Sequence, residues 1–246
     1  MTKDLLADLN AEQKEAVTHG EGPLLILAGA GTGKTNVITH RIAHLLEQGK
    51  AKPDEILALT FTEKAATEMS DRLFAMDLKQ IPSQISTFHY FGDTILREYC
   101  YELGLPADFA VMGEAQQVIF LDERLFDLPI EKLRPHGRPA KNLQAMAKTF
   151  SRAKNENRSP EEYGELIKEE AVRAAKIDDV EERADALYEL EIQKEIAGCF
   201  AYYEQQKDET HRLDYADQVF KAVRLLRDND VIRKRFANQF KYVLVD

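Results

Sequence analysis

The stretch LLILAGAGTGKT, residues 24–35, decides how the rest of this sequence is interpreted. An apolar run preceded by Pro23 ends in a turn with three glycines, and the turn closes on Lys34 and Thr35. A short apolar run of this kind is typical of a parallel strand that is buried on both faces. Apolar residues then recur at helical spacing as far as Gly49. The pattern predicts a buried strand, a loop and a helix in succession.

The residue types of the turn fit a phosphate group. Glycines allow positive φ angles and let backbone N–H groups approach an anion closely, and the positive end of a helix dipole points to the same place. Lys34 is expected to reach the terminal phosphates, and the Thr35 hydroxyl is expected to ligate Mg²⁺. This is the Walker A pattern with Ala28 in place of its first glycine. We predict nucleotide binding here, the alternative being a glycine-rich connector in an ordinary α/β protein.

Length and composition limit the broad class of the protein. The 246 residues suffice for one large domain or two smaller ones, with 44% hydrophobic and 31% charged residues. The sequence begins with no signal peptide and contains no apolar run of membrane-spanning length, so we expect a cytoplasmic protein without a membrane partner. The two cysteines, Cys100 and Cys199, are interpreted as free buried thiols.

The net charge of −10 at first argues against nucleic acid, because phosphate backbones attract lysine and arginine. The acidic excess is concentrated between Glu156 and Glu195, where carboxylates outnumber basic residues by roughly two to one. An acidic protein still binds single strands through a local groove of aromatic and polar groups. The net charge alone therefore does not exclude DNA.

Near the N-terminus, Asn10 and Gln13 have the spacing of a capping box and predict a helix start. A glutamine amide also donates to and accepts from an adenine edge at the same time. Both roles are compatible, because a capped helix is a rigid mount for such an amide.

Two further strands are predicted, and each ends in polar and aromatic residues. Phe61 follows the strand 56–60, and Phe88 and His89 follow the strand 84–87. Ligands of open α/β sheets bind at the carboxyl ends of the strands. The pattern favours a rim for sugar, phosphate and base contacts, with a core role for Phe61 and an ordinary histidine at His89 as the alternatives.

From about Cys100 to Arg224 helical periodicity and charge dominate, and we predict an all-helical insertion. Within it, the segment 151–158, SRAKNENR, is either a solvated loop or a contact to the DNA backbone. After the insertion, the apolar segment 242–245 ends in Asp246, as a Walker B strand does when its aspartate holds Mg²⁺ opposite Thr35.

Taken together, these motifs resemble the N-terminal part of the UvrD/Rep/PcrA helicases of superfamily 1. LNAEQKEAV is similar to the Q motif, AGAGTGKT to motif I, ALTFTEKAATEMSDR to motif Ia and STFHYFGDTILRE to motif Ib. SRAKNENRSPEEY and RLDYADQ resemble blocks that flank the DNA-contacting subdomain, and KYVLVD resembles motif II, of which only the first acid is present. The resemblance covers nearly the whole chain. It implies an α/β fold in which a RecA-like P-loop NTPase domain with a parallel sheet carries the all-helical subdomain.

The resemblance also implies site residues and ligands. The cofactors are ATP and Mg²⁺, Lys34 and Asp246 are catalytic, and Thr35 and Asp246 hold the metal. The implied nucleotide contacts are Gln13, Ala28, Gly29, Ala30, Gly31, Thr32, Gly33, Lys34, Thr35 and Arg41. The implied contacts to single-stranded DNA are Thr60, Phe61, Thr62, Lys64, Thr87, Phe88 and His89, with Phe61 as a stacking platform. Asn36 stands where members often have a basic residue, so one nucleotide contact differs here.

We expect residues 1–99 to form the first part of the RecA-like core, 100–224 the insertion and 225–246 the return segment. The implied parent is an ATP-dependent 3′-to-5′ helicase that acts on single strands and on junctions of single- and double-stranded DNA. Its implied partners are repair or recombination proteins. These residues alone are expected to be a monomer that binds nucleotide weakly and neither hydrolyses ATP efficiently nor unwinds.

Two alternatives to this interpretation remain open. One is the helicase subunit of a helicase–nuclease of the AddA or RecB kind, and the other is a non-enzymatic module that binds nucleotide or single-stranded DNA.

Overall fold

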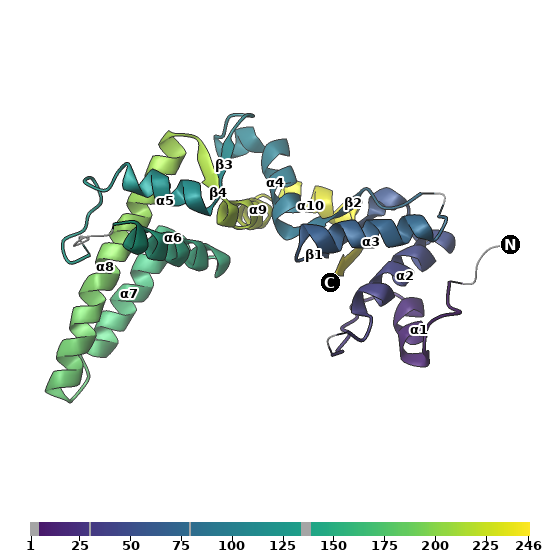
Figure 1. The fold of residues 1–246 in the computed structure, drawn as a ribbon, viewed down its shortest axis with the longest axis horizontal. Helices are drawn as coiled ribbons and strands as arrows, with labels where there is room; N and C mark the ends of the chain where they lie inside the picture. The colour runs from purple at the N-terminus through teal and green to yellow at the C-terminus, as the bar shows by residue number, and fades with distance from the viewer. Residues whose placement is uncertain (1–4, 30, 79, 134–138) are drawn as a thin grey trace. The chain divides into compact units, whose positions relative to one another are not determined.

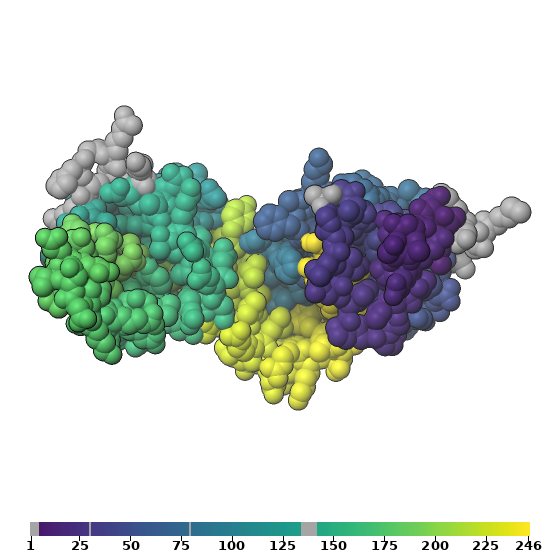
Figure 2. Space-filling view, turned by 90° about the horizontal axis from the view of Figure 1, so that it is seen from below, coloured from purple at the N-terminus to yellow at the C-terminus, as the bar shows by residue number. Residues whose placement is uncertain are grey.

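A computed structural model describes residues 5–29, 31–78, 80–133 and 139–246 (Figure 1). The chain divides into two compact units. The first unit comprises Met1–Phe91 and Leu225–Asp246, and the second comprises Gly92–Arg224. Figure 2 shows the yellow surface of the C-terminal segment directly beside the purple and blue surface of the N-terminal segment. The first unit is therefore built from both ends of the chain.

A three-stranded parallel sheet lies at the centre of the first unit. Its order is β2, β1, β5, with Ala58 opposite both Ile85 and Leu244. The bounds are Ile56–Thr60 for β1, Gln84–Thr87 for β2 and Tyr242–Val245 for β5. These are the three strands predicted at 56–60, 84–87 and 242–245, and they are confirmed. Because the strands are parallel, the residues that follow them share one edge of the sheet.

Alternate side chains of β1 face opposite layers of helices, which explains why all five of its residues are buried. Ile56 and Ala58 pack in one cluster with apolar residues of α2 and α3. Leu57 and Leu59 pack with Phe240 on the other face, where Phe91 and Phe236 meet in an edge-to-face contact. The helices of this unit, including those that cross into the second unit, are α1 Ala11–Thr18, α2 Lys34–Glu47, α3 Glu63–Ala75, α4 Phe88–Glu98, α9 Tyr215–Asp228 and α10 Asp230–Gln239.

The buried strand predicted before the glycine-rich turn is not formed. Residues 24–27 have no strand pairing, and the side chains of Leu25 and Leu27 are 81% and 87% exposed. An apolar run supplies side chains for a strand but not the hydrogen-bonding partner that a strand also needs. The two edge strands of the described sheet are β2 and β5, and residues 24–27 pair with neither of them.

The second unit is mostly helical but not entirely so. Its helices are α5 Glu114–Asp122, α6 Pro139–Asn155, α7 Pro160–Ala174 and α8 Val180–Glu209, together with the second half of α4 and most of α9. Figure 1 shows α7 and α8 side by side. The short strands β3 Ala110–Met112 and β4 Arg212–Asp214 pair in parallel. The prediction of an all-helical insertion is therefore corrected, because a pair of three-residue strands leaves too short a pattern to detect.

Aromatic rings fill the core of the second unit. Phe150 and Phe200 stack with ring centroids 5.0 Å apart, and Tyr203 lies against both Phe150 and Phe120. Cys199, in the same cluster, and Cys100 are both buried and free, as predicted. No helix among the described residues is long and apolar enough to cross a membrane.

Candidate nucleotide and DNA site

The predicted phosphate loop ends where α2 begins. Gly33 immediately precedes the helix with a φ of 88°, a left-handed conformation that glycine adopts without strain. The ammonium of Lys34 points back into the loop and donates to the carbonyl oxygens of Ala28 at 3.1 Å and Gly29 at 2.7 Å. The hydroxyl of Thr32 donates to the Gly29 carbonyl at 2.8 Å. If a triphosphate bound here, the Lys34 ammonium would donate to phosphate oxygens in place of these carbonyls.

The two predicted metal ligands lie in direct contact although 211 positions separate them. The hydroxyl of Thr35 donates to a carboxylate oxygen of Asp246 at 2.6 Å. The backbone N–H of Asp246 donates to the Leu59 carbonyl at 2.9 Å, which continues the sheet and fixes this carboxylate at its edge. A hydroxyl and a carboxylate at one exposed point are hard oxygen ligands of the kind that Mg²⁺ prefers, so the residues present fit that ion.

Gln13 is shared between the helix cap and the loop. Its side-chain oxygen accepts from the backbone N–H of Asn10 at 3.1 Å, and the Asn10 side chain accepts from the backbone N–H of Gln13 at 2.8 Å. The predicted capping box is therefore confirmed. The amide nitrogen of Gln13 also donates to the Thr32 carbonyl at 3.2 Å. One N–H and one lone pair of the amide remain, which is the donor and acceptor pair that an adenine edge requires.

Arg41, also predicted at the nucleotide, points to the end of α1. Arg41 is 8% exposed, and its guanidinium donates to four backbone carbonyls, those of Ala16, Val17, His19 and Gly20. Burial lowers the pKa of this guanidinium, and attraction to Tyr242 and Glu21 partly opposes that shift. A nucleotide contact by Arg41 stays a prediction. Of the other predicted loop residues, Gly31 and Gly33 have positive φ, and Ala30 lies outside the described residues.

The predicted DNA rim separates into exposed and buried side chains. Phe61 is 85% exposed, so the alternative of a core phenylalanine is wrong, and Thr62, Lys64, Phe88 and His89 are exposed as well. Thr60 and Thr87 are buried. The Thr60 hydroxyl donates to the Thr62 carbonyl at 3.0 Å, and the Thr87 hydroxyl accepts from the backbone N–H of Tyr90 at 3.2 Å. These two threonines therefore hold the strand ends, and of the seven predicted DNA contacts only the other five are exposed.

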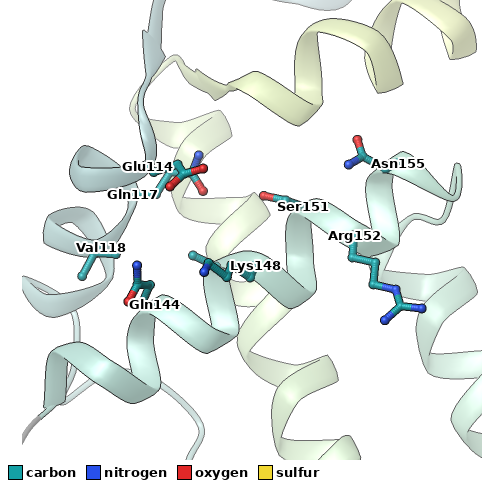
Figure 3. A pocket seen from close by; sticks show the side chains of 9 residues that line it. Glu114, Gln117, Val118, Gln144, Lys148, Ser151, Arg152 and Asn155 are labelled. Carbon is teal, nitrogen blue, oxygen red and sulfur yellow. The ribbon is translucent and has the colours of Figure 1, made fainter. Parts of the chain in front are cut away.

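The basic segment 151–158 of the second unit offers fewer charges than its sequence indicates. Arg152 is exposed and pairs with Glu156 at 3.2 Å, whereas the ammonium of Lys154 is completely buried. Arg152 and Lys148 also line a groove of about 200 Å³ between α5 and α6. Figure 3 shows Glu114 and Gln117 on α5 across from Lys148 and Ser151 on α6, while Arg152 extends away from them. Burial therefore removes Lys154 from the possible contacts to DNA.

Lys154 belongs to an ion network that sequence analysis did not find. Its ammonium lies 2.5 Å from a carboxylate oxygen of Asp214 and 2.9 Å from one of Asp217. The ammonium of Lys207 contacts the same two aspartates, and Glu204 contacts both lysines. At the start of α9, the Asp214 carboxylate accepts from the backbone N–H of Asp217, and the Asp217 carboxylate accepts from the backbone N–H of Asp214. Asp214 directly precedes α9 and Asp217 lies in its first turn. This three-residue spacing is a capping signal that could have identified them.

The charges of this ion network, comprising Lys154, Lys207, Asp214, Asp217 and Glu204, stabilise one another. Burial by itself would raise the pKa of the Asp217 carboxyl, but Lys207 and Lys154 outweigh it and hold that pKa well below its usual range. Burial would lower the pKa of Lys207, but the surrounding carboxylates raise it well above its ordinary value. The three carboxylates lie close enough to hold a cation, and the lysine ammoniums already supply the positive charge there.

Comparison with known proteins identifies the family of this chain. The UvrD/REP helicase N-terminal domain matches residues 9–246. The ATP-dependent DNA helicase Rep of Escherichia coli K12 is 35% identical over 241 residues, and the ATP-dependent DNA helicase PcrA of Bacillus subtilis is 31% identical over 251 residues. PcrA of Leuconostoc citreum is 31% identical over 240 residues.

These matches cover 97% to 100% of this chain but only 28% to 32% of the length of the three relatives. The matched domain includes the phosphate loop, the three strand ends and the inserted unit. The chain belongs to the UvrD/REP helicase family and corresponds to its N-terminal domain.

Proposed function

We propose that this chain provides the ATP-binding and part of the single-strand-binding surface of an ATP-dependent 3′-to-5′ DNA helicase. The observation that carries the proposal is the contact between Thr35 and Asp246, which joins the start of α2 to the end of β5 beside Lys34. Lys34 would bind the terminal phosphates, and Thr35 with Asp246 would hold Mg²⁺, which would supply positive charge to neutralise the phosphate oxygens. Gln13 contacts the adenine edge through its remaining N–H and lone pair.

The DNA part of the proposal uses the exposed residues at the strand ends. Phe61 follows β1, and Phe88 and His89 begin α4 directly after β2, so the parallel sheet brings aromatic side chains to one edge. Bases of any sequence stack on aromatic rings, and Lys64 supplies a charge for the backbone. Such a surface binds a single strand without reading its sequence.

Titrating a fluorescent single-stranded oligonucleotide with this protein, at two salt concentrations, tests the DNA part by anisotropy. We expect binding that weakens with salt and that falls about fivefold or more in Phe61→Ala, because stacking contributes about 1 to 3 kcal/mol per base. Phe74→Ala is the matched control, since Phe74 is also an exposed phenylalanine, 67% exposed on α3, but does not follow a strand. Equal losses in both variants would contradict a stacking role for Phe61.

Calorimetric titration with ATP and Mg²⁺ tests the nucleotide part. Lys34→Met and Thr35→Ala should each weaken binding, and Thr35→Ala should also reduce the dependence on Mg²⁺. Thr67→Ala serves as the control, because the Thr67 hydroxyl donates only within α3. Unchanged ATP affinity in Lys34→Met would contradict the assignment of this loop.

A further inference from the structure

Helix α1 carries Gln13 but has few apolar contacts of its own. It is eight residues long, and Val17 is its only fully buried residue. The cluster beneath it is small, with Leu9, Val17 and Val37 at its centre. Isolated helices of this length are marginal in water, so the position of α1 depends strongly on polar contacts to its neighbours.

Two sets of polar contacts hold α1 against α2 and the loop. At its N-terminal end, the amide of Gln13 donates to the Thr32 carbonyl. At its C-terminal end, one Arg41 nitrogen donates to the carbonyls of Ala16, Val17 and His19, at 3.2, 3.2 and 2.9 Å, and the other donates to Gly20 at 3.3 Å. The last carbonyls of a helix lack partners within the helix, and a cation there is favoured by the helix dipole.

We propose that Arg41 is a positioning residue that fixes the end of α1 and thereby aims the Gln13 amide at a bound purine. This inference rests on the proposed nucleotide site. It assigns to Arg41 a role different from the direct nucleotide contact that the family resemblance implies. The four carbonyls occupy both terminal nitrogens of a buried guanidinium, whereas Lys34 at the start of the same helix faces the loop. Arg41 therefore affects recognition of the base, whereas Lys34 affects binding of the phosphates.

Little space separates the Gln13 side chain from the phosphate loop, so the contact between them is sensitive to the position of α1. A Cβ atom added at Gly33 would lie 3.2 Å from the Gln13 amide nitrogen, which is tighter than an ordinary van der Waals contact. A small displacement of α1 therefore alters the contact between Gln13 and the loop. Loss of the Arg41 contacts should loosen residues 11–20 while α2, packed by Ile42 and Leu45 in the sheet cluster, stays in place.

Binding of ATP, GTP and inorganic tripolyphosphate, each with Mg²⁺, by the full chain tests the proposal. Arg41→Lys and Arg41→Gln should lower ATP affinity about fivefold, the equivalent of one hydrogen bond, and reduce the preference for ATP over GTP. Gln13→Ala should do the same, and the double variant should lose little more than either single one. Tripolyphosphate affinity should not change. Arg233→Ala is the control, because Arg233 pairs on the exposed surface of α10 with Asp230.

Equal losses for ATP, GTP and tripolyphosphate in the Arg41 variants would overturn the proposal and indicate a phosphate contact. Amide hydrogen exchange gives a readout without nucleotide: residues 11–20 should exchange faster in Arg41→Lys, and residues 34–47 should not. Unchanged exchange at 11–20 would overturn the positioning role. If the unaltered chain bound neither ATP nor tripolyphosphate, the proposed function and the aim at a purine would both fail. Faster exchange at 11–20 would then show only that Arg41 holds α1.

Discussion

The phosphate loop and the ion network both use lysine and aspartate side chains, in opposite surroundings. At the loop, the partly buried Lys34 donates to two loop carbonyls, and the carboxylate of the exposed Asp246 accepts from one hydroxyl. In the network, Lys154 and Lys207 are completely buried, and each contacts three carboxylates. The loop keeps weak partners that a ligand can replace, whereas the network has partners that no ligand replaces.

Residue type alone therefore does not identify a binding site. A buried charge costs several kcal/mol to desolvate and persists only if it is paired. A lysine that is only partly buried, beside carbonyls, retains most of its capacity to attract an anion. Substitutions that remove the charge should therefore change folding in one region and binding in the other.

The largest effect is expected for Lys207→Met. Removal of this ammonium leaves three carboxylates with only Lys154, so the free energy of unfolding should fall by about 3 to 5 kcal/mol. Urea denaturation followed by circular dichroism measures the loss. Adding Asp217→Asn should restore part of it, because the amide oxygen still accepts from the Asp214 backbone N–H while one negative charge is removed. A loss below about 1 kcal/mol in Lys207→Met would contradict the pairing described.

The next effect is the acid dependence of stability. The Asp217 pKa lies below its ordinary value of 3.8, so the unfolded chain binds this proton more readily than the folded chain. The stabilisation is present above about pH 4 and is lost as the pH falls further. The raised Lys207 pKa acts in the opposite range: its contribution is present below the ordinary value of 10.5 and is lost as the pH rises past the folded value.

Denaturation at pH 7, 5 and 3 checks this prediction. We expect little change from pH 7 to 5 and a loss of about 1 kcal/mol at pH 3 from Asp217. In Lys207→Met the acid dependence of this carboxyl should be much weaker, because its main cation is gone. An equal acid dependence in both proteins would assign the effect to other carboxylates.

Local patterns in the sequence predicted the parts of the fold that local chemistry determines. The Asn10 and Gln13 capping box, the helix that begins at Lys34 and the three strands of the sheet all follow from residue spacing. The strand at 24–27 was wrong because pairing depends on an edge elsewhere in the chain. Lys154 was interpreted as a surface charge because its burial depends on carboxylates 50 to 63 positions away.

Asp246→Asn, at the phosphate loop, should have an effect of intermediate size. The amide keeps an oxygen for the Thr35 hydroxyl but loses the negative charge that attracts Mg²⁺, so affinity for Mg²⁺-ATP should fall about tenfold. Calorimetric titration measures the change, and the unfolding free energy should stay within about 0.5 kcal/mol. Asp54→Asn is the matched control, because Asp54 lies before β1, at the opposite end of that strand from the loop. An equal loss in the control would indicate a general charge effect.

The smallest effect on stability is expected for Lys34→Met, the counterpart of Lys207→Met in the phosphate loop. Lys34→Met also exchanges a lysine for a methionine, yet it should change the unfolding free energy by less than about 0.5 kcal/mol, since the Lys34 side chain is only partly buried and its two acceptors remain accessible to water. The same denaturation experiment on both variants measures the contrast directly. A destabilisation in Lys34→Met comparable to that in Lys207→Met would mean that the loop depends on its lysine for folding. Lys34 would then be as much a structural cation as Lys207, and the contrast between the accessible loop and the buried ion network would fail.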